Sequence, residues 1–257
     1  MQSNASPYSS TFAKIALACF VGVITHLDGV SQTWVQKGDS LNAPGKYSHF
    51  GNDVDISADG NVIVVGSPEN DGDESSVGFI SVFEWVENKW KQVGEDIRGV
   101  STYEHFGGSV SMSWDGNIIA AGGSGFNWRV GIVRVFNRKD NLWSQIGSDI
   151  TGESSQDRAA YNSLDSAGIT LAVGSPGFDN TYENAGKVRV FEWTGGSWSQ
   201  KGTSIEGLEA EDNFGASVKL SASGNILAIG AGIYHLQVKP ERVRIFTWNG
   251  TDWVQKG

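Results

Sequence analysis

A tryptophan returns at an almost constant interval along this 257-residue chain. It occupies Trp34, Trp90, Trp143, Trp198 and Trp253, so the successive steps are 56, 53, 55 and 55 residues. A fixed period above about forty residues indicates an array of one supersecondary unit, in which each unit packs on its neighbours. The sequence therefore constrains the architecture much more tightly than it constrains the ligand.

Each repeat divides into four short runs that are typical of β-strands. The first run alternates apolar residues after a Phe-Gly pair and ends in a tight turn such as Asp59-Gly60-Asn61. The second run, such as residues 62–66, is apolar at nearly every position, which is typical of a strand covered on both faces. The third run alternates again, and the fourth begins at the repeated tryptophan. Four antiparallel strands in each unit predict the blade of an all-β, β-propeller fold.

The repeat boundaries predict the domain organisation. Four clear blades are expected over about 50–99, 106–152, 157–207 and 214–257, and the strand at Trp34 is expected to come from a preceding blade. Blade three departs from the pattern, since it has Ala159-Ala160 in place of Phe-Gly and is one residue short before Gly168.

Residues 1–31 have two interpretations. The apolar run from Ile15 to Ile24 follows Lys14 and has the length of a signal-peptide core. The repeat register also extends through this segment, so it can instead form a degenerate fifth blade. Removing it would leave the Trp34 strand as an unpaired edge, which proteins usually avoid. Both alternatives stay open.

The repeats resemble a known family. The Phe-Gly start and the Gly-Ser-Pro at residues 66–68 and 174–176 resemble FG-GAP repeats, the blades of integrin-α-type propellers. The closest resemblance is to a variant with Trp-x-Gln-x-Gly, Asp-Gly-Asn and Val-Arg-Val-Phe-Glu-Trp motifs, found in large extracellular proteins of microbes and algae. The resemblance covers Trp34 to Gly257 and implies a propeller that acts in recognition or adhesion outside the cell.

Composition excludes some partners. The formal net charge of −10 and the pI near 4.8 oppose binding to nucleic-acid phosphates or to anionic membranes, and stable membrane insertion of the mature domain is not expected. Cys19 is the only cysteine, so no intramolecular disulfide can form.

One loop has the acid spacing of a weak metal site. Asp71, Asp73 and Glu74 surround Gly72 and can supply oxygen ligands to Ca²⁺, the one cofactor that the sequence suggests. The alternative is a solvated acidic turn. The calcium loop of the FG-GAP family lies elsewhere in the repeat, so its ligands do not transfer to these residues.

Aromatic residues in the variable loops are the candidate ligand-binding groups. Phe126, Trp128, Tyr182 and Tyr234 can stack on sugar rings or anchor a protein partner. The alternative is that they cap the ends of the hydrophobic core. Asn249 begins an Asn-Gly-Thr match to an N-glycosylation acceptor in an expected turn.

The sequence offers little for catalysis. Neither a Ser-His-Asp pattern nor a His or Cys cluster occurs, and of the matching first-strand positions Asp55, Ser111 and Lys219 only one is acidic. The recurring Arg134, Arg189 and Arg244 are expected to make solvated cross-strand pairs.

These observations predict a non-catalytic extracellular or cell-surface recognition scaffold that binds a protein or a glycan through its loops. A structural matrix or coat protein is the first alternative, and a propeller hydrolase acting on polysaccharide is the second. Fold alone does not decide between them.

Overall fold

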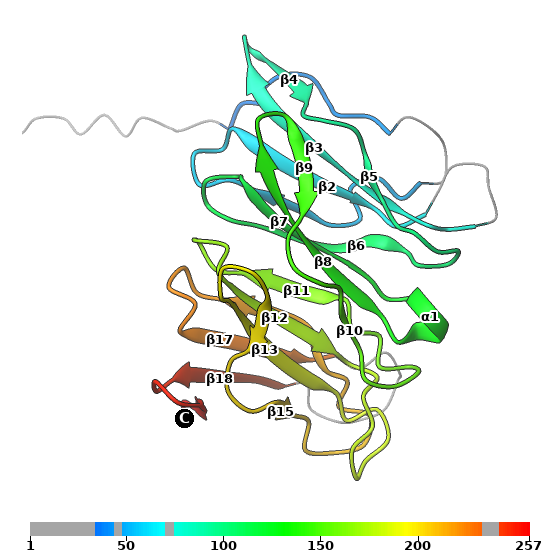
Figure 1. Ribbon diagram of the computed structural model, residues 1–257, viewed down its shortest axis with the longest axis vertical. Helices are drawn as coiled ribbons and strands as arrows, with labels where there is room; N and C mark the ends of the chain where they lie inside the picture. The colour runs from blue at the N-terminus through cyan, green and yellow to red at the C-terminus, as the bar shows by residue number, and fades with distance from the viewer. Residues whose placement is uncertain (1–33, 44–47, 70–74, 233–241) are drawn as a thin grey trace, which may run out of the picture. The chain divides into compact units, whose positions relative to one another are not determined.

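The computed structural model describes residues 34–43, 48–69, 75–232 and 242–257. The chain divides into two compact units, residues 1–37 and 38–257, and every sheet belongs to the second. Four antiparallel sheets follow one another along the sequence (Figure 1). The fold is therefore the predicted all-β array of propeller blades.

Each blade has four main strands, and the first three add a two-residue fifth strand. Blade 1 contains β1 (Val54–Ile56), β2 (Val62–Ser67), β3 (Phe79–Val86), β4 (Lys89–Gln92) and β5 (Ile97–Arg98). Blade 2 contains β6 (Phe106–Met112), β7 (Ile118–Gly123), α1 (Phe126–Arg129), β8 (Ile132–Lys139), β9 (Leu142–Gln145) and β10 (Ile150–Thr151). Blade 3 contains β11 (Tyr161–Leu164), β12 (Thr170–Ser175), β13 (Lys187–Trp193), β14 (Trp198–Gln200) and β15 (Ile205–Glu206). Blade 4 contains β16 (Phe214–Leu220), β17 (Ile226–Ala231), β18 (Arg242–Trp248) and β19 (Trp253–Gln255).

The Trp-x-Gln-x-Gly motif joins neighbouring blades. Gly94 has a φ of +75°, which bends the chain between β4 and β5, and an added Cβ there would lie 3.3 Å from the Trp143 ring of the next blade. The Trp143 indole N–H donates to the carbonyl of Val93, the residue before that glycine. The indoles of Trp198 and Trp253 repeat this bond to the preceding blade. The period seen in the sequence is thus the period of an inter-blade contact.

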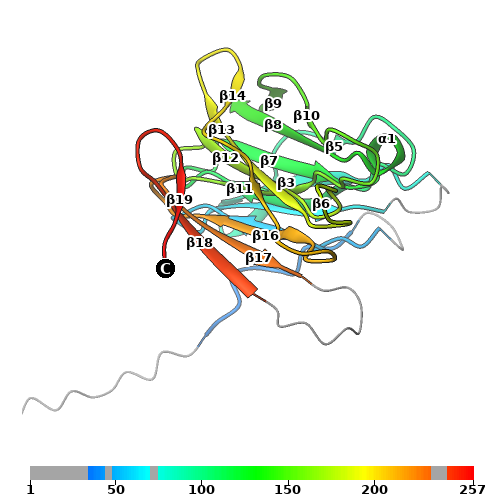
Figure 2. The same cartoon turned by 90° about the horizontal axis from the view of Figure 1, so that it is seen from below.

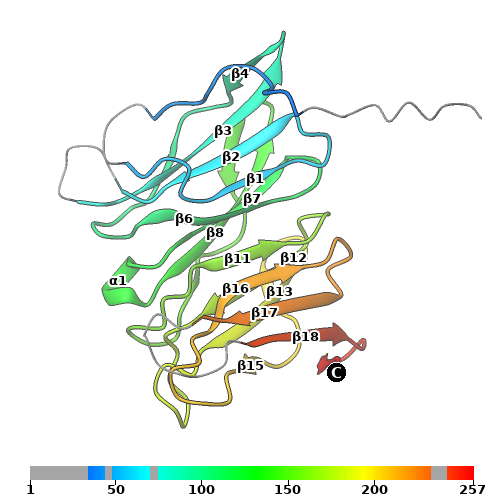
Figure 3. The same cartoon turned by 180° about the vertical axis from the view of Figure 1, so that it is seen from behind.

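The first strands of the four blades, β1, β6, β11 and β16, run next to one another (Figure 3). Polar side chains on each strand accept backbone N–H groups of the next. Asp53 accepts from Val110 N at 2.7 Å, and Asp55 accepts from Met112 N at 2.8 Å. Ser111 and Ser163 make the corresponding contacts at the next two junctions. Their side chains therefore link the blades at the centre of the array.

The second strands approach the next blade closely. An added Cβ on Gly122 would lie 1.9 Å from the Ala160 carbonyl oxygen, and Gly66 and Gly174 meet Gly107 and Gly215 of their next blades in the same way. No side chain fits at such a distance, so the repeat requires glycine there.

The missing residue of blade three removes a β-bulge. The β6–β7 and β16–β17 pairings each shift register after the Phe of the Phe-Gly pair, at Phe106 and at Phe214. The β11–β12 pairing runs from Tyr161 to Leu164 without a shift. The deletion thus straightens the strand and leaves the blade intact.

Hydrophobic clusters fill the spaces between successive sheets. Ile80, Val133 and Val188 occupy one repeat position in β3, β8 and β13 and are fully buried under the following blade. The equivalent Val243 of β18 is 69% exposed, because no blade of the described residues packs on it. Val54 of β1 is 57% exposed at the other end of the array, where its counterpart Val110 is buried.

The strand predicted at Trp34 is not formed, since residues 34–43 contain no strand. In the other blades the equivalent tryptophan strand pairs with the third strand of its own blade, as Trp90 does with Trp85. The corresponding partner of Trp34 would lie in residues 1–33, which are outside the described part of the chain. The segment that the signal-peptide and fifth-blade interpretations concern, residues 1–31, lies outside it as well.

Candidate functional site

Two kinds of segment meet at one end of the sheets. The β7–β8 and β12–β13 loops lie there with the links between blades, and the β18–β19 turn lies at the opposite end (Figure 2). The β7–β8 loop contains α1, and the link before β6 covers residues 99–105. Between them lies a cavity of about 820 Å³. Its lining residues are Ser101, Thr102, Tyr103, His105, Ser124, Gly125, Asn127, Trp128, Arg129, Arg158 and Tyr161. This volume is in the range of small-ligand sites.

The cavity combines aromatic and cationic groups. Trp128 is 84% exposed on the β7–β8 loop, and Tyr103 is 58% exposed on the link before β6. Arg129, Arg158 and His105 also line it, and no aspartate or glutamate of the described residues does. In a protein of net charge −10 this is a local reversal of sign.

The α1 segment is a left-handed turn. Asn127, Trp128 and Arg129 have φ values of 46°, 59° and 65°, a conformation that costs about 1–2 kcal/mol for each residue with a Cβ. The next blade holds it in place, because Arg158 N donates to the Arg129 carbonyl at 2.8 Å and Gln156 N donates to the Trp128 carbonyl. These bonds fix the backbone from which the side chains project, and strained backbone of this kind concentrates at functional sites.

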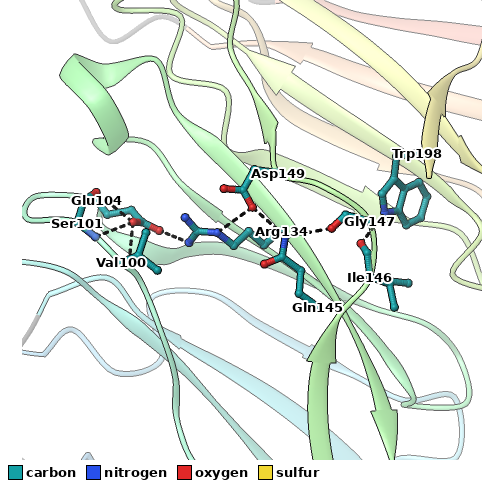
Figure 4. Close-up of polar contacts among 9 residues, drawn as sticks. All are labelled: Val100, Ser101, Glu104, Arg134, Gln145, Ile146, Gly147, Asp149 and Trp198. Carbon is teal, nitrogen blue, oxygen red and sulfur yellow. Dashed lines mark hydrogen bonds and ion pairs between the residues drawn. The ribbon is translucent and has the colours of Figure 1, made fainter. Parts of the chain in front are cut away.

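A buried ion pair holds the other wall (Figure 4). Glu104 has no exposed surface, and its Oε2 accepts the backbone N–H groups of Val100 and Ser101 and the Ser101 hydroxyl. Its Oε1 pairs with Arg134 Nη1 at 2.5 Å, and Arg134 Nε reaches Asp149 at 3.2 Å. Glu104 thereby folds the link between the blades, and its neighbours Tyr103 and His105 enter the cavity.

Arg134 also supports the α1 wall. Its guanidinium carbon lies 5.9 Å from the centre of the Phe126 ring, and Gly125 N donates to the Glu104 carbonyl at 3.1 Å. The two walls therefore share one buried anchor.

Other blades repeat this anchor. Asp157 and Asp212 are buried at the position of Glu104, and each accepts two backbone N–H groups of its own link. Arg189 and Arg244 occupy the position of Arg134, and burial lowers the pKa of both guanidinium groups. Blade 1 has Ser48 and Ser81 at the two positions, so acid and arginine are absent together.

The expectation that Arg134, Arg189 and Arg244 would be solvated is therefore wrong. Arg134 is 4% exposed, and Arg189 donates to the Thr151 carbonyl and lies 3.6 Å from Glu153. The links between blades cover this face of the third strands, which strand periodicity alone assigns to solvent.

The predicted site residues fall in different places. Trp128 lines the cavity, and Phe126 lies half-buried behind the wall against Arg134. Tyr182 is 47% exposed on the β12–β13 loop and does not line this cavity. Tyr234 lies outside the described residues. Asn249 is exposed in the β18–β19 turn, where its side-chain oxygen accepts the Thr251 N–H.

The predicted calcium ligands Asp71, Asp73 and Glu74 also lie outside the described residues. Elsewhere in the described chain, no three His, Cys, Asp or Glu side chains gather as a metal site would require. Within the same residues, no helix is long and apolar enough to cross a membrane.

A second, smaller cavity of about 360 Å³ is lined by residues in and beside the first strands of the four blades. Asp53, Asp55, Asn162 and Lys219 line it, so two carboxylates are present where the sequence pattern drew attention to Asp55 alone. Burial raises the pKa of Asp53, against hydrogen bonds from the N–H groups of Val110 and Val54 that lower it. Both carboxylates accept backbone N–H groups of β6, which accounts for them as structural links between the blades.

Sequence reasoning missed Tyr103, His105 and Arg158 as cavity residues. They come from two different links between blades. Pairing of β6 with β7 brings Tyr103 and His105 to the α1 loop, and the packing of blade 2 on blade 3 brings Arg158 there. The signal that was available is the Trp128-Arg129 pair in a loop of variable sequence.

Comparisons with solved structures concern the fold. A protein from Bacteroides fragilis named as a candidate 6-phosphogluconolactonase has a TM-score of 0.51 at 15% identity, over 79% of this chain and 52% of that one. The hypothetical selenium-binding protein from Sulfolobus tokodaii has a TM-score of 0.51 at 9% identity, over 79% and 53%. The β-propeller domain of the Trilobed protease from Pyrococcus furiosus has a TM-score of 0.45 at 10% identity, over 76% and 54%.

This chain thus spans about half the length of each of these proteins. No protein family and no curated protein matches the sequence. The four antiparallel sheets together with these similarities establish a β-propeller scaffold.

Proposed function

We propose that the protein is a non-catalytic recognition scaffold that binds a glycan in the cavity between α1 and the blade links. The observation that carries this proposal is the pair of exposed aromatic residues, Trp128 and Tyr103, that line one cavity. An exposed indole or phenol ring offers an apolar face on which a sugar ring can stack, and such a side chain has only two χ angles to order.

The frame suits this role. The strands repeat closely from blade to blade, while the β2–β3, β7–β8 and β12–β13 loops differ in sequence, and the β7–β8 loop is the shortest of the three. Function concentrates in loops that a rigid scaffold positions. The buried Glu104–Arg134 pair and the bonds from Arg158 and Gln156 fix the cavity walls before any ligand arrives.

The proposed location is outside the cell or at its surface. Support comes from the resemblance to FG-GAP repeats and from the exposed Asn249-Gly250-Thr251 acceptor. Expression in a secreting eukaryotic host should give a glycosylated product, and Asn249→Gln should remove the glycan mass at that turn. An unmodified product that stays inside the cells would contradict the extracellular role.

The absence of catalysis is part of the proposal. A polysaccharide hydrolase on this scaffold would use Asp53 or Asp55 as an acid or a nucleophile, whereas both carboxylates accept hydrogen bonds from backbone N–H groups of β6. Cleavage of any polysaccharide by the wild-type protein, abolished by Asp53→Asn or Asp55→Asn in a folded variant, would show that the scaffold is an enzyme.

A glycan array tests the binding proposal. The wild-type protein should bind a restricted set of glycans, and Trp128→Ala should abolish binding because the stacking surface is lost. Trp114→Ala is the matched control, since Trp114 is also exposed, at 58%, in the β6–β7 turn at the other end of the strands. Binding that survives Trp128→Ala, or binding to proteins and to no glycan, would refute the proposal.

A further inference from the structure

We propose that the cavity selects acidic saccharides, with Arg129 and Arg158 contacting a carboxylate or sulfate group while Trp128 and Tyr103 stack on the sugar ring. This inference rests on the proposed function and adds the chemical class of the ligand.

The first support is the pairing of arginines in the described residues. Most arginines have a carboxylate partner within 4.0 Å, namely Arg98, Arg134, Arg138, Arg189 and Arg242. Arg244 lacks one but donates to the Glu206 carbonyl and to Gln255, and it packs between two phenylalanine rings.

Arg129 and Arg158 differ from that group. Neither has a carboxylate within 4.0 Å among the described residues, and the side-chain contact of Arg158 is a 3.4 Å approach to the neutral Asn213 amide. Both face the same cavity. Two guanidinium groups without counter-ions at one concave site complement an anion, which arginine binds through paired N–H donors.

The second support is the absence of opposing charge in the walls. Among the described residues, the lining contains serine, threonine, glycine, asparagine, histidine and aromatic residues besides the two arginines, and no acidic side chain. An anionic ligand therefore meets no like charge from these residues. Hydroxyl groups of a sugar can use the polar side chains of Ser101, Thr102 and Asn127.

The net charge of the whole protein narrows the class of acidic saccharides that we expect to bind. A net charge of −10 repels a uniformly charged polyanion, whose remaining groups would extend over an acidic surface. A single acidic sugar within a mostly neutral glycan avoids that repulsion. We therefore expect short or sparsely charged acidic glycans to bind better per site than densely charged polymers.

Titration calorimetry with defined tetrasaccharides tests the inference. The probes are tetragalacturonate, its fully methyl-esterified form, which keeps the rings and loses the charge, and a tetragalacturonate esterified on all but one residue. The wild-type protein should prefer the singly charged probe to the neutral one by about tenfold or more, as expected for a charge-assisted hydrogen-bonded contact.

Variants assign the preference to residues. Arg129→Gln together with Arg158→Gln should reduce the preference to less than about threefold while the neutral probe still binds, because stacking remains. Lys139→Gln together with Lys256→Gln is the matched control, since it removes two positive charges from exposed positions that do not line the cavity. It should leave the preference unchanged.

The outcomes are distinguishable. Failure of every saccharide to bind would contradict the proposed function itself. Equal binding of the charged and neutral probes would overturn the acidic specificity and leave glycan recognition in place. A preference that persists in the double arginine variant would overturn the assignment to Arg129 and Arg158. A tetrasaccharide whose only charged group is one sulfate, if bound as tightly as the singly charged uronate, would support a site that recognises a negative charge on a sugar, whether carboxylate or sulfate carries it.

Discussion

Replacing Arg134 by methionine tests how the blades and the cavity are anchored. Methionine fills similar volume but removes the charge that faces Glu104, whose side chain has no exposed surface. A buried charge that loses its partner costs about 3–5 kcal/mol. Glu104 Oε2 keeps three hydrogen bonds from Val100 and Ser101, so we expect a loss near the lower limit, about 3 kcal/mol.

A double-mutant cycle separates the pair from its surroundings. In the variant with Glu104→Gln and Arg134→Met, the glutamine oxygen can still accept the link N–H groups and no charge is left buried. We therefore expect the double variant to be more stable than Arg134→Met alone, with a coupling free energy of about 2 kcal/mol. Blade 1, which has serine at both equivalent positions, shows that a blade tolerates the joint loss.

Urea denaturation followed by fluorescence gives the four free energies of unfolding. Arg138→Met is the matched control, because Arg138 pairs with Glu84 at 2.8 Å where Glu84 is one-third exposed, and it should cost about 1 kcal/mol or less. Additive single-variant effects, within about 0.5 kcal/mol, would refute the reasoning, as would an Arg134→Met variant no less stable than the control.

The other predictions use repeat-equivalent or local comparisons. Val188→Asp should lower the free energy of unfolding by more than about 3 kcal/mol, whereas Val243→Asp should cost less than about 1 kcal/mol; equal costs would mean that Val243 is covered. Gly122→Ala should destabilise by more than about 2 kcal/mol in the same assay, because the added methyl group meets a backbone carbonyl, and a neutral effect would contradict that packing. Hydrogen bonds from the Ser57 hydroxyl and from Asn61 lower the pKa of Asp59 to about 2, so Ser57→Ala should raise it toward 3.8 in an NMR titration. The depressed pKa stabilises the fold above the unfolded value, and this stability is lost as pH falls from the unfolded pKa through about 2. With the folded pKa raised toward 3.8, Ser57→Ala should lose less stability over that range, and an unchanged titration would argue against the Ser57 bond.

Most of the fold could be predicted because its repeat consists of local signals. Alternating apolar residues, Asp-Gly-Asn turns and the spaced tryptophans each report on contacts within one blade or with the adjacent one. The Trp143 bond to the Val93 carbonyl explains why the tryptophan and the glycine of the motif occur together. A pattern of this kind needs no long-range information.

The arginines show where strand periodicity fails. Alternation places Arg134 on the face opposite the core residues of β8, and a lone sheet would leave that face in water. In the array, the link that contains Glu104 folds over it, and a separate segment of sequence supplies the counter-charge. The acid and the arginine lie 30 residues apart, and their joint replacement by serine in blade 1 is the sequence signal that connects them.

The candidate site was predictable in part. An exposed Trp128 follows from an aromatic residue outside the repeat positions, whereas the left-handed turn that presents it does not, because Asn127, Trp128 and Arg129 carry no glycine to signal positive φ. Tyr103 and Arg158 belong to links whose sequences read as ordinary turns. Pairing of β6 with β7 brings Tyr103 to the α1 loop, and the packing of blade 2 on blade 3 brings Arg158 there.

Fluorine NMR of protein labelled with 5-fluorotryptophan tests the central claim, that the cavity beside α1 is the ligand site. Single Trp→Phe variants assign the resonances of Trp128 and Trp114. Addition of the singly charged tetragalacturonate should shift the Trp128 resonance in a saturable manner and leave that of Trp114 unchanged. A ligand that binds without moving the Trp128 resonance, or one that shifts Trp114 instead, would place recognition elsewhere and contradict the account.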